Sequence, residues 1–415
     1  MITVTDTATT EDTLMIHICS KHAPITEELI ELLESDPSLK RLLERAIAKA
    51  AAANPNRDTN PAQSLDEYFA FVDRVSTALP WAVNPSGRYS SLYWRIDQGM
   101  GCFYFIGDQP LEELEDLGYY HPSLTYHEPF RSWMNRFVAA CGQFLDTPDS
   151  WSEEYYRNAL ANPDFHLDDG TYEDPANWRT FNEFFTRALR DPSVRPIAFP
   201  EDESVIVSPT DATPQGLWRI DENSRVILSE AEREGGGIPV KTTSLSSIAD
   251  LLHGSRYADV FAGGVLTHTF LDINDYHRYH FPVSGTVLER ALVPGADAPG
   301  GVIRWYEDEG FYHESYSELY GWQSIETRGY VIVDMGTYGF AAIVPVGMCQ
   351  VSSVNFEENV QTGSSVRKGD LLGMFKFGGS DIVMIFQKKA GFRLTAEPGK
   401  HLLTGQEYGR FSASF

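Results

Sequence analysis

Hydrophobic residues recur at helical spacing in the first third of the chain. Residues 25–53 place Leu and Ile three and four positions apart, and Asp36-Pro37 interrupts the pattern. Because the residue before a proline disfavours helical backbone, the pattern predicts a pair of helices. A capping-type start at Ser64 predicts another helix, and residues 130–145 predict an amphipathic helix rich in aromatic side chains.

A polar, proline-bearing stretch at residues 163–178 predicts a boundary. One core rarely serves 415 residues, so we expect two domains, a helical one over residues 1–175 and a second over residues 176–415. The second begins with a short helix from Thr180 that leads into an Arg195-Pro196 turn.

Beyond Val205 the pattern changes to short segments rich in β-formers and separated by Gly, Pro and Asn. The glycine and aliphatic spacing in residues 285–295 and 360–375 is typical of a barrel-sandwich core. The predicted fold class is therefore α+β. The expected strands lie at residues 204–209, 264–271, 330–336, 340–348 and 381–386.

A formal net charge of −26 limits the kinds of partner. Nucleic-acid affinity depends on Lys and Arg contacts to phosphate, so no nucleic-acid partner is expected. Each basic residue near an anionic membrane contributes about 1 kcal/mol of attraction, so an acidic excess also disfavours stable membrane association.

The four cysteines are scattered and form no CxxC pair, which suits a reducing compartment and structural thiols. Residues 1–20 lack the basic start and sustained apolar run of a signal peptide, and no later stretch has the length of a membrane span. We therefore expect a soluble, cytoplasmic protein. The cysteines are Cys19, Cys102, Cys141 and Cys349.

The most distinctive chemistry lies in Gly378-Gly379-Ser380, between apolar strand-like segments. Glycines allow backbone conformations closed to other residues, so the Ser380 hydroxyl can reach the Gly379 carbonyl and form an ester. Elimination from that ester leaves a pyruvoyl group. A Gly-Gly-Ser sequence is, however, more often only a turn.

Two other motifs offer partners for Ser380. The DYHRYH sequence at residues 275–280 supplies His277 and His280, and Asp211 follows a Ser-Pro pair. Taken singly, His280 is more often a structural histidine, and Asp211 is more often a turn residue that bonds its own backbone. A metal site at His268, His277 and His280 is disfavoured because no cysteine completes it, so no metal is expected.

The joint order of these motifs resembles the phosphatidylserine decarboxylase family of pyruvoyl enzymes. The order is Ser-Pro-x-Asp at 208–211, Asp-Tyr-His-Arg-x-His at 275–280 and Gly-Ser at 379–380, preceded by FFTRALRDPSVRPI at 184–197. The resemblance covers residues 180–415 and implies a mostly antiparallel β domain. The helical N-terminal part and the Gly-Gly-Ser sequence are more similar to a soluble branch that includes fungal L-tryptophan decarboxylases.

The resemblance implies a self-processing triad in which Asp211 orients His280 and His280 deprotonates Ser380. Cleavage between Gly379 and Ser380 then leaves residues 1–379 and 380–415, which stay together as partners, and converts Ser380 into a pyruvoyl cofactor. Pyridoxal phosphate is not required. His277 matches the position that delivers a proton to the product carbon, and a purely structural role is the alternative.

Three functions remain open. The first is decarboxylation of a free L-amino acid, with tryptophan-like substrates favoured and a homodimer possible. The second is a phosphatidylserine decarboxylase that makes phosphatidylethanolamine. The third is a non-catalytic biotinyl or lipoyl carrier module, which needs a lysine at a hairpin tip that residues 360–375 lack.

Asp381 departs from the family, in which the residue after the nucleophile is often Ser or Thr. A carboxylate there disfavours the oxyanion of the acyl shift unless it is protonated or turned away. Arg278 is a candidate counter-charge, although an ordinary solvated arginine is the favoured interpretation.

Overall fold

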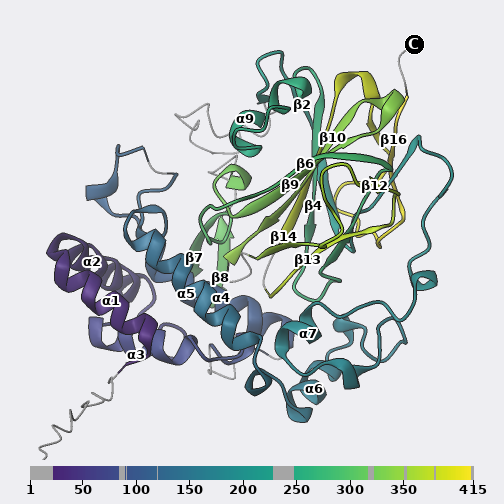
Figure 1. Ribbon diagram of the computed structural model, residues 1–415. Helices are drawn as coiled ribbons and strands as arrows, with labels where there is room; N and C mark the ends of the chain where they lie inside the picture. Colours follow the sequence, from purple (N-terminus) through teal and green to yellow (C-terminus); the bar gives the residue numbers. More distant parts are fainter. Residues whose placement is uncertain are drawn as a thin grey trace, which may run out of the picture.

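The computed structural model describes residues 22–83, 89, 91–118, 120–227, 247–315, 322–349, 353–377 and 380–412. Helices gather in the first half of the chain and antiparallel sheets in the second, as Figure 1 shows. This arrangement confirms the predicted α+β class with an N-terminal helical region.

The predicted helical pair is α1 (Pro24–Ser35) and α2 (Pro37–Ala53). Asp36 ends the first helix and caps the second, because its side chain accepts hydrogen bonds from the Ser38 and Leu39 amides. Ser64 caps α3 (Leu65–Val75) in the same way, and α5 spans Phe130–Leu145 as predicted.

The pattern of polar residues did not reveal α4 (Leu92–Gly107), which lies among α2, β7 and β8. Most of its residues are buried, so no polar stripe marks a solvent face. Its glycines also lower helix propensity, and Gly101 is required because a Cβ there would lie 2.6 Å from Tyr312 Cβ. The other α-helices of the described residues are α6 (Glu153–Leu160), α7 (Phe181–Phe185) and α9 (Ile248–Leu251).

An eight-stranded sheet forms the centre of the β-rich part. Its strands pair antiparallel, and β14 lies between β10 and β4. Their order is β12 (Ser365–Val366), β6 (Gly285–Val293), β9 (Arg328–Asp334), β10 (Phe340–Gly347), β14 (Ser380–Phe386), β4 (Val265–Leu271), β2 (Thr213–Ile220) and β3 (Val226–Ile227).

Three smaller sheets accompany it. Each sheet ends in two edge strands among the described residues, so the sheets are open where the glycine spacing predicted a barrel-sandwich core. The first joins β1 (Val205–Val207), β16 (Glu407–Arg410) and β15 (Arg393–Leu394). The second joins β11 (Val354–Phe356), β13 (Leu371–Phe375) and β5 (Arg278–His280), and the third pairs β7 (Val302–Tyr306) with β8 (Phe311–Ser315).

One buried cluster joins the helices to the β-rich part. It contains residues of α1 to α5 together with Ile273, Tyr312 and Phe377. The division at residues 175 and 176 therefore stays a prediction, because apolar contacts cross it. Phe377, which precedes the Gly-Gly-Ser segment, packs on the helical side of the molecule.

Candidate active site

Ser380 is the first residue of β14, the strand between β10 and β4. It lies opposite Gly347 on one neighbour and Leu271 on the other. Its side chain is fully buried, and its Oγ has no hydrogen-bond partner among the described residues. Gly379, the other side of the predicted cleavage site, lies outside the described residues, as does Gly378.

His277 lies beside the segment that leads to Ser380. Its ring packs on Phe185 with centroids 4.0 Å apart, and Phe185 in turn contacts Phe377 at 5.3 Å. The His277 carbonyl accepts a hydrogen bond from the Phe375 amide at 2.9 Å. The DYHRYH motif and the strand before the Gly-Gly-Ser sequence are therefore neighbours in space.

A hydrogen bond of 2.9 Å between His277 Nδ1 and the Asp275 backbone carbonyl determines which ring nitrogen carries a proton. A carbonyl only accepts, so Nδ1 carries a proton, and Nε2 is the nitrogen that can take up or release another. Arg187 reinforces the arrangement, because its guanidinium donates to the same Asp275 carbonyl at 3.2 Å and to the Asn274 carbonyl at 2.6 Å.

His280 occupies a different environment from that expected for a base next to Ser380. Its Nδ1 donates to the Gly369 carbonyl at 2.8 Å, and its Nε2 lies 3.1 Å from the Tyr276 hydroxyl. Burial lowers the pKa of this ring, so it is neutral at pH 7. His280 is thus in the basic form, with the hydroxyl of Tyr276 on its free nitrogen.

Among the described residues, the Asp211 carboxylate accepts hydrogen bonds from Arg195 and Thr404 and not from the His280 ring, so the orienting role of Asp211 stays a prediction. Arg195 holds the carboxylate with a forked contact whose shortest N–O distance is 2.7 Å, and Thr404 donates to it through its amide and its hydroxyl. A buried carboxylate needs a compensating charge, and the planar guanidinium supplies two donors at once. The Asp211 charge still acts on His280 through space, since it opposes the lowering of that pKa by burial.

The backbone beside Asp211 nevertheless joins the DYHRYH motif directly. The Thr210 hydroxyl donates to the Tyr276 carbonyl at 2.7 Å and to the Arg278 carbonyl at 3.1 Å. The His280 amide donates to the Pro209 carbonyl at 2.7 Å. The structure therefore brings the Ser-Pro-x-Asp motif next to DYHRYH, and DYHRYH next to the strand before the Gly-Gly-Ser sequence. Within the described part of the chain, no hydrogen bond joins the side chains of Asp211, His280 and Ser380 to one another.

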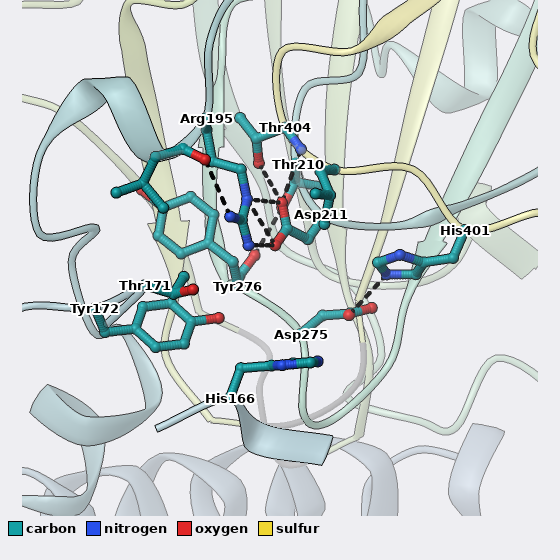
Figure 2. A network of polar contacts seen from close by, with 12 residues as sticks. His166, Thr171, Tyr172, Arg195, Thr210, Asp211, Asp275, Tyr276, His401 and Thr404 are labelled. Carbon is teal, nitrogen blue, oxygen red and sulfur yellow. Dashed lines mark hydrogen bonds and ion pairs between the residues drawn. The ribbon is translucent and has the colours of Figure 1, made fainter. Parts of the chain in front are cut away.

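A polar cavity of about 370 Å³ opens beside Asp211. Figure 2 shows side chains that line it, among them Arg195, Asp211, Asp275 and His401. In the lining of this cavity, His401 Nε2 lies 2.9 Å from the Asp275 carboxylate, and this hydrogen bond raises the pKa of His401. Burial raises the pKa of Asp275. The lining residues are His166, Asp169, Thr171, Tyr172, Arg195, Asp211, Asp272, Asn274, Asp275, His401 and Leu403, and they do not include Ser380, His277 or His280.

The sequence interpretation missed the roles of Arg187, Arg195 and His401. Both arginines lie in the FFTRALRDPSVRPI segment, so the resemblance already marked the segment, although not which carboxylate or carbonyl each arginine binds. His401 lies in a stretch without any recognised motif, and only the fold brings it to Asp275.

Asp381 is turned away from Ser380. Successive residues of a strand point to opposite faces, and the Asp381 carboxylate lies 2.9 Å from His268 Nδ1. Arg278 does not act as its counter-charge, because its Nε donates to the Thr186 carbonyl at 2.7 Å. The partner of the extra carboxylate is therefore a histidine on β4.

The described residues show neither a metal site nor a membrane-spanning helix. In that part of the chain, no group of three or more His, Cys, Asp or Glu residues is arranged to hold a metal ion. None of the helices described combines the length and apolar character that crossing a bilayer requires.

Comparison with known proteins places these features in context. Decarboxylase iboD of Amanita muscaria is 26% identical over 303 residues, covering 66% of this chain and 82% of the relative. A phosphatidylserine decarboxylase proenzyme of Brevibacillus brevis is 30% identical over 259 residues, covering 58% of this chain and 83% of the relative.

A longer relative, phosphatidylserine decarboxylase proenzyme 3 of Schizosaccharomyces pombe, is 31% identical over 210 residues, which are 51% of this chain but 19% of that protein. The chain likewise covers 36% of proenzyme 2 of Oryza sativa. The family model for phosphatidylserine decarboxylase matches residues 181–410, more than half of the chain. With the three motifs in the family's order on neighbouring segments, the chain belongs to the phosphatidylserine decarboxylase family of pyruvoyl-type decarboxylases.

Proposed function

We propose that this protein decarboxylates a free L-amino acid, with aromatic, tryptophan-like substrates favoured, after cutting its own chain between Gly379 and Ser380. The observation that carries the proposal is the state of Ser380. Its hydroxyl is fully buried at the head of β14, and within the part of the chain that the structure describes its Oγ has no hydrogen-bond partner. A buried hydroxyl without a partner is unfavourable in a finished fold, and chemistry that consumes it removes that penalty.

The family's pyruvoyl cofactor, formed from a serine, fits this position. Elimination from the ester removes the Ser380 oxygen with the carboxylate of residue 379 and leaves a double bond between Cα and Cβ. Water then replaces the nitrogen, which leaves as ammonia, so the buried Cα becomes a ketone carbon and Cβ a methyl group. Such a ketone binds the substrate amine and accepts the electrons released as carbon dioxide leaves.

The predicted site residues have separate tasks in this proposal. His280, neutral because burial lowers its pKa, serves as the base for self-cleavage. His277 keeps its proton on Nδ1 and presents Nε2 for proton transfer at the product carbon. Asp211 acts indirectly, since Arg195 and Thr404 fix it while its charge favours the protonated state of His280.

Charge supports a free amino acid over a lipid. A net charge of −26 opposes docking on an anionic membrane, to which each basic residue adds only about 1 kcal/mol of attraction. The name of the Amanita muscaria relative is decarboxylase, without a lipid substrate, and 82% of that protein is covered by the alignment.

Phosphatidylserine decarboxylation remains the second candidate, because the relatives from Schizosaccharomyces pombe, Oryza sativa and Brevibacillus brevis carry that name. Both candidates share the cofactor and the self-cleavage. They differ in the substrate. A cytoplasmic location is part of the free-amino-acid proposal.

Intact mass spectrometry of the purified protein beside Ser380→Ala tests the cleavage. We expect two fragments, residues 1–379 and 380–415, for the wild type and one unbroken chain for the variant. Release of carbon dioxide from free tryptophan, compared with phosphatidylserine vesicles, then tests the substrate. An active wild-type protein that stays whole would refute the proposal, and activity confined to vesicles would replace the first candidate with the second.

A further inference from the structure

Asp381 places a buried carboxylate directly after Ser380, on the C-terminal side of the bond that is proposed to break. The residue is fully buried in β14. The next two residues alternate between cores, since Ile382 belongs to one buried cluster and Val383 to the other. By the same alternation, Asp381 shares the face of Val383 and lies across the sheet from the Ser380 hydroxyl.

His268 on β4 is the partner of this carboxylate. Its Nδ1 lies 2.9 Å from one Asp381 oxygen and 3.1 Å from the other. In the β4–β14 register, Asp381 faces Phe270 and Val383 faces His268, so the pair forms a diagonal contact on one face of the sheet. The contact is shielded, because the His268 side chain is 18% exposed and that of Asp381 is 0% exposed.

The neighbouring strand β2 fixes the imidazole. The Trp218 ring stacks on His268 with centroids 5.0 Å apart and planes 24° apart. Directly opposite His268 stands Gly216, where an added Cβ would lie 2.9 Å from the Trp218 ring. The missing side chain thus makes room for the indole, and the indole holds the histidine against Asp381.

The proposed self-cleavage develops negative charge close to this carboxylate. The Ser380 Oγ–carbon bond forms as the carbon–nitrogen bond between residues 379 and 380 breaks, and the hydroxyl proton ends on that nitrogen. Between these states the carbonyl oxygen of residue 379 carries a negative charge. An unpaired carboxylate nearby raises the energy of that oxyanion, because water does not screen charges in a buried site.

We propose that His268 is a positioning residue for self-cleavage, which offsets the Asp381 charge and holds it on the face of β14 opposite the Ser380 hydroxyl. This inference rests on the proposed cleavage between residues 379 and 380. It assigns to β2 and β4 a part in the maturation of β14, although neither strand carries a member of the predicted triad.

A double-mutant cycle tests the proposal, with cleavage of freshly synthesised chain followed by intact mass spectrometry over time. His268→Gln leaves the carboxylate without its partner, so we expect cleavage to slow by at least about tenfold. Asp381→Asn removes the charge and should cleave at a rate near that of the wild type. The double variant His268→Gln/Asp381→Asn should recover to within about threefold of the wild type, since no buried charge is left to offset.

The same substitutions in a Ser380→Ala chain, which stays whole, give the thermal stability of each variant without cleavage. A double variant that cleaves as slowly as His268→Gln would overturn the proposal, because the slowing would then come from lost packing. If His268→Gln alone does not fold, the cleavage rate of the double variant still tests the proposal, since that variant carries no unpaired charge. A wild type that never cleaves refutes the proposed function, whereas a wild type and variants that all cleave at one rate refute only the role of His268.

Discussion

Removing the Arg195 guanidinium should destabilise the protein strongly, because it leaves Asp211 buried without its counter-charge. The Arg195 side chain is 10% exposed and that of Asp211 is 4% exposed, and their shortest N–O distance is 2.7 Å. Breaking a buried ion pair by removing one partner costs about 3–5 kcal/mol. Thr404 keeps two hydrogen bonds to the carboxylate, so we expect about 3 kcal/mol for Arg195→Met.

Urea unfolding of Arg195→Met in a Ser380→Ala chain measures this value, because the Ser380→Ala chain is expected to stay whole. Arg157→Met is the matched control. Its pair with Glu153 has an N–O distance of 3.2 Å, but the two side chains are 72% and 69% exposed. An exposed pair of this kind contributes less than about 1 kcal/mol.

Arg195→Met/Asp211→Asn should regain part of the loss, since the second change removes the charge that the first leaves unpaired. Equal unfolding free energies for Arg195→Met and Arg157→Met would refute the reasoning. That result would mean that water or Thr404 alone satisfies Asp211, and that Arg195 is free for other contacts in the cavity.

Two further predictions concern other groups. Burial raises the pKa of Asp108 to about 7, so the folded protein holds this proton more tightly than the unfolded chain, and its contribution to stability is lost as pH rises from about 4 towards 7. Asp108→Asn should therefore flatten the dependence of the unfolding free energy on pH, by up to about 1.4 kcal/mol per pH unit, and an unchanged slope in urea titrations would contradict this. His277→Gln should leave cleavage intact while lowering kcat about a hundredfold to ten-thousandfold, whereas loss of both activities would indicate a structural role.

The sequence predicted local structure well wherever one residue decides it. Asp36-Pro37 ends one helix and caps the next, and Thr180 with Glu183 forms a capping box at the start of α7. These signals act over three or four residues, so they are visible without the fold. By contrast, α4 is buried on most sides, and its identity depends on neighbours that the sequence does not show.

The candidate site was predictable as a set of motifs but not as a set of contacts. The order of Asp211, DYHRYH and Ser380 suggested one triad, and the backbone does bring these segments together. The contacts of the side chains, however, depend on which of several possible partners binds each group most strongly. The two donors of a guanidinium bind a buried carboxylate more strongly than a neutral imidazole does, so Arg195 takes the place beside Asp211, a contact that no sequence motif predicted.

The position of Ser380 explains how a chain that cuts itself there keeps its fold. All seven residues of β14 are buried, and the strand pairs along its whole length with β10 and with β4. Five of the seven are Ile, Val, Met or Phe, and burying each contributes about 1.5–3 kcal/mol. Further along, β16 pairs with β1, which precedes the cut in the chain. Breaking the peptide bond before Ser380 removes at most the ladder hydrogen bond of that residue's own amide, so residues 380–415 should stay in the sheet.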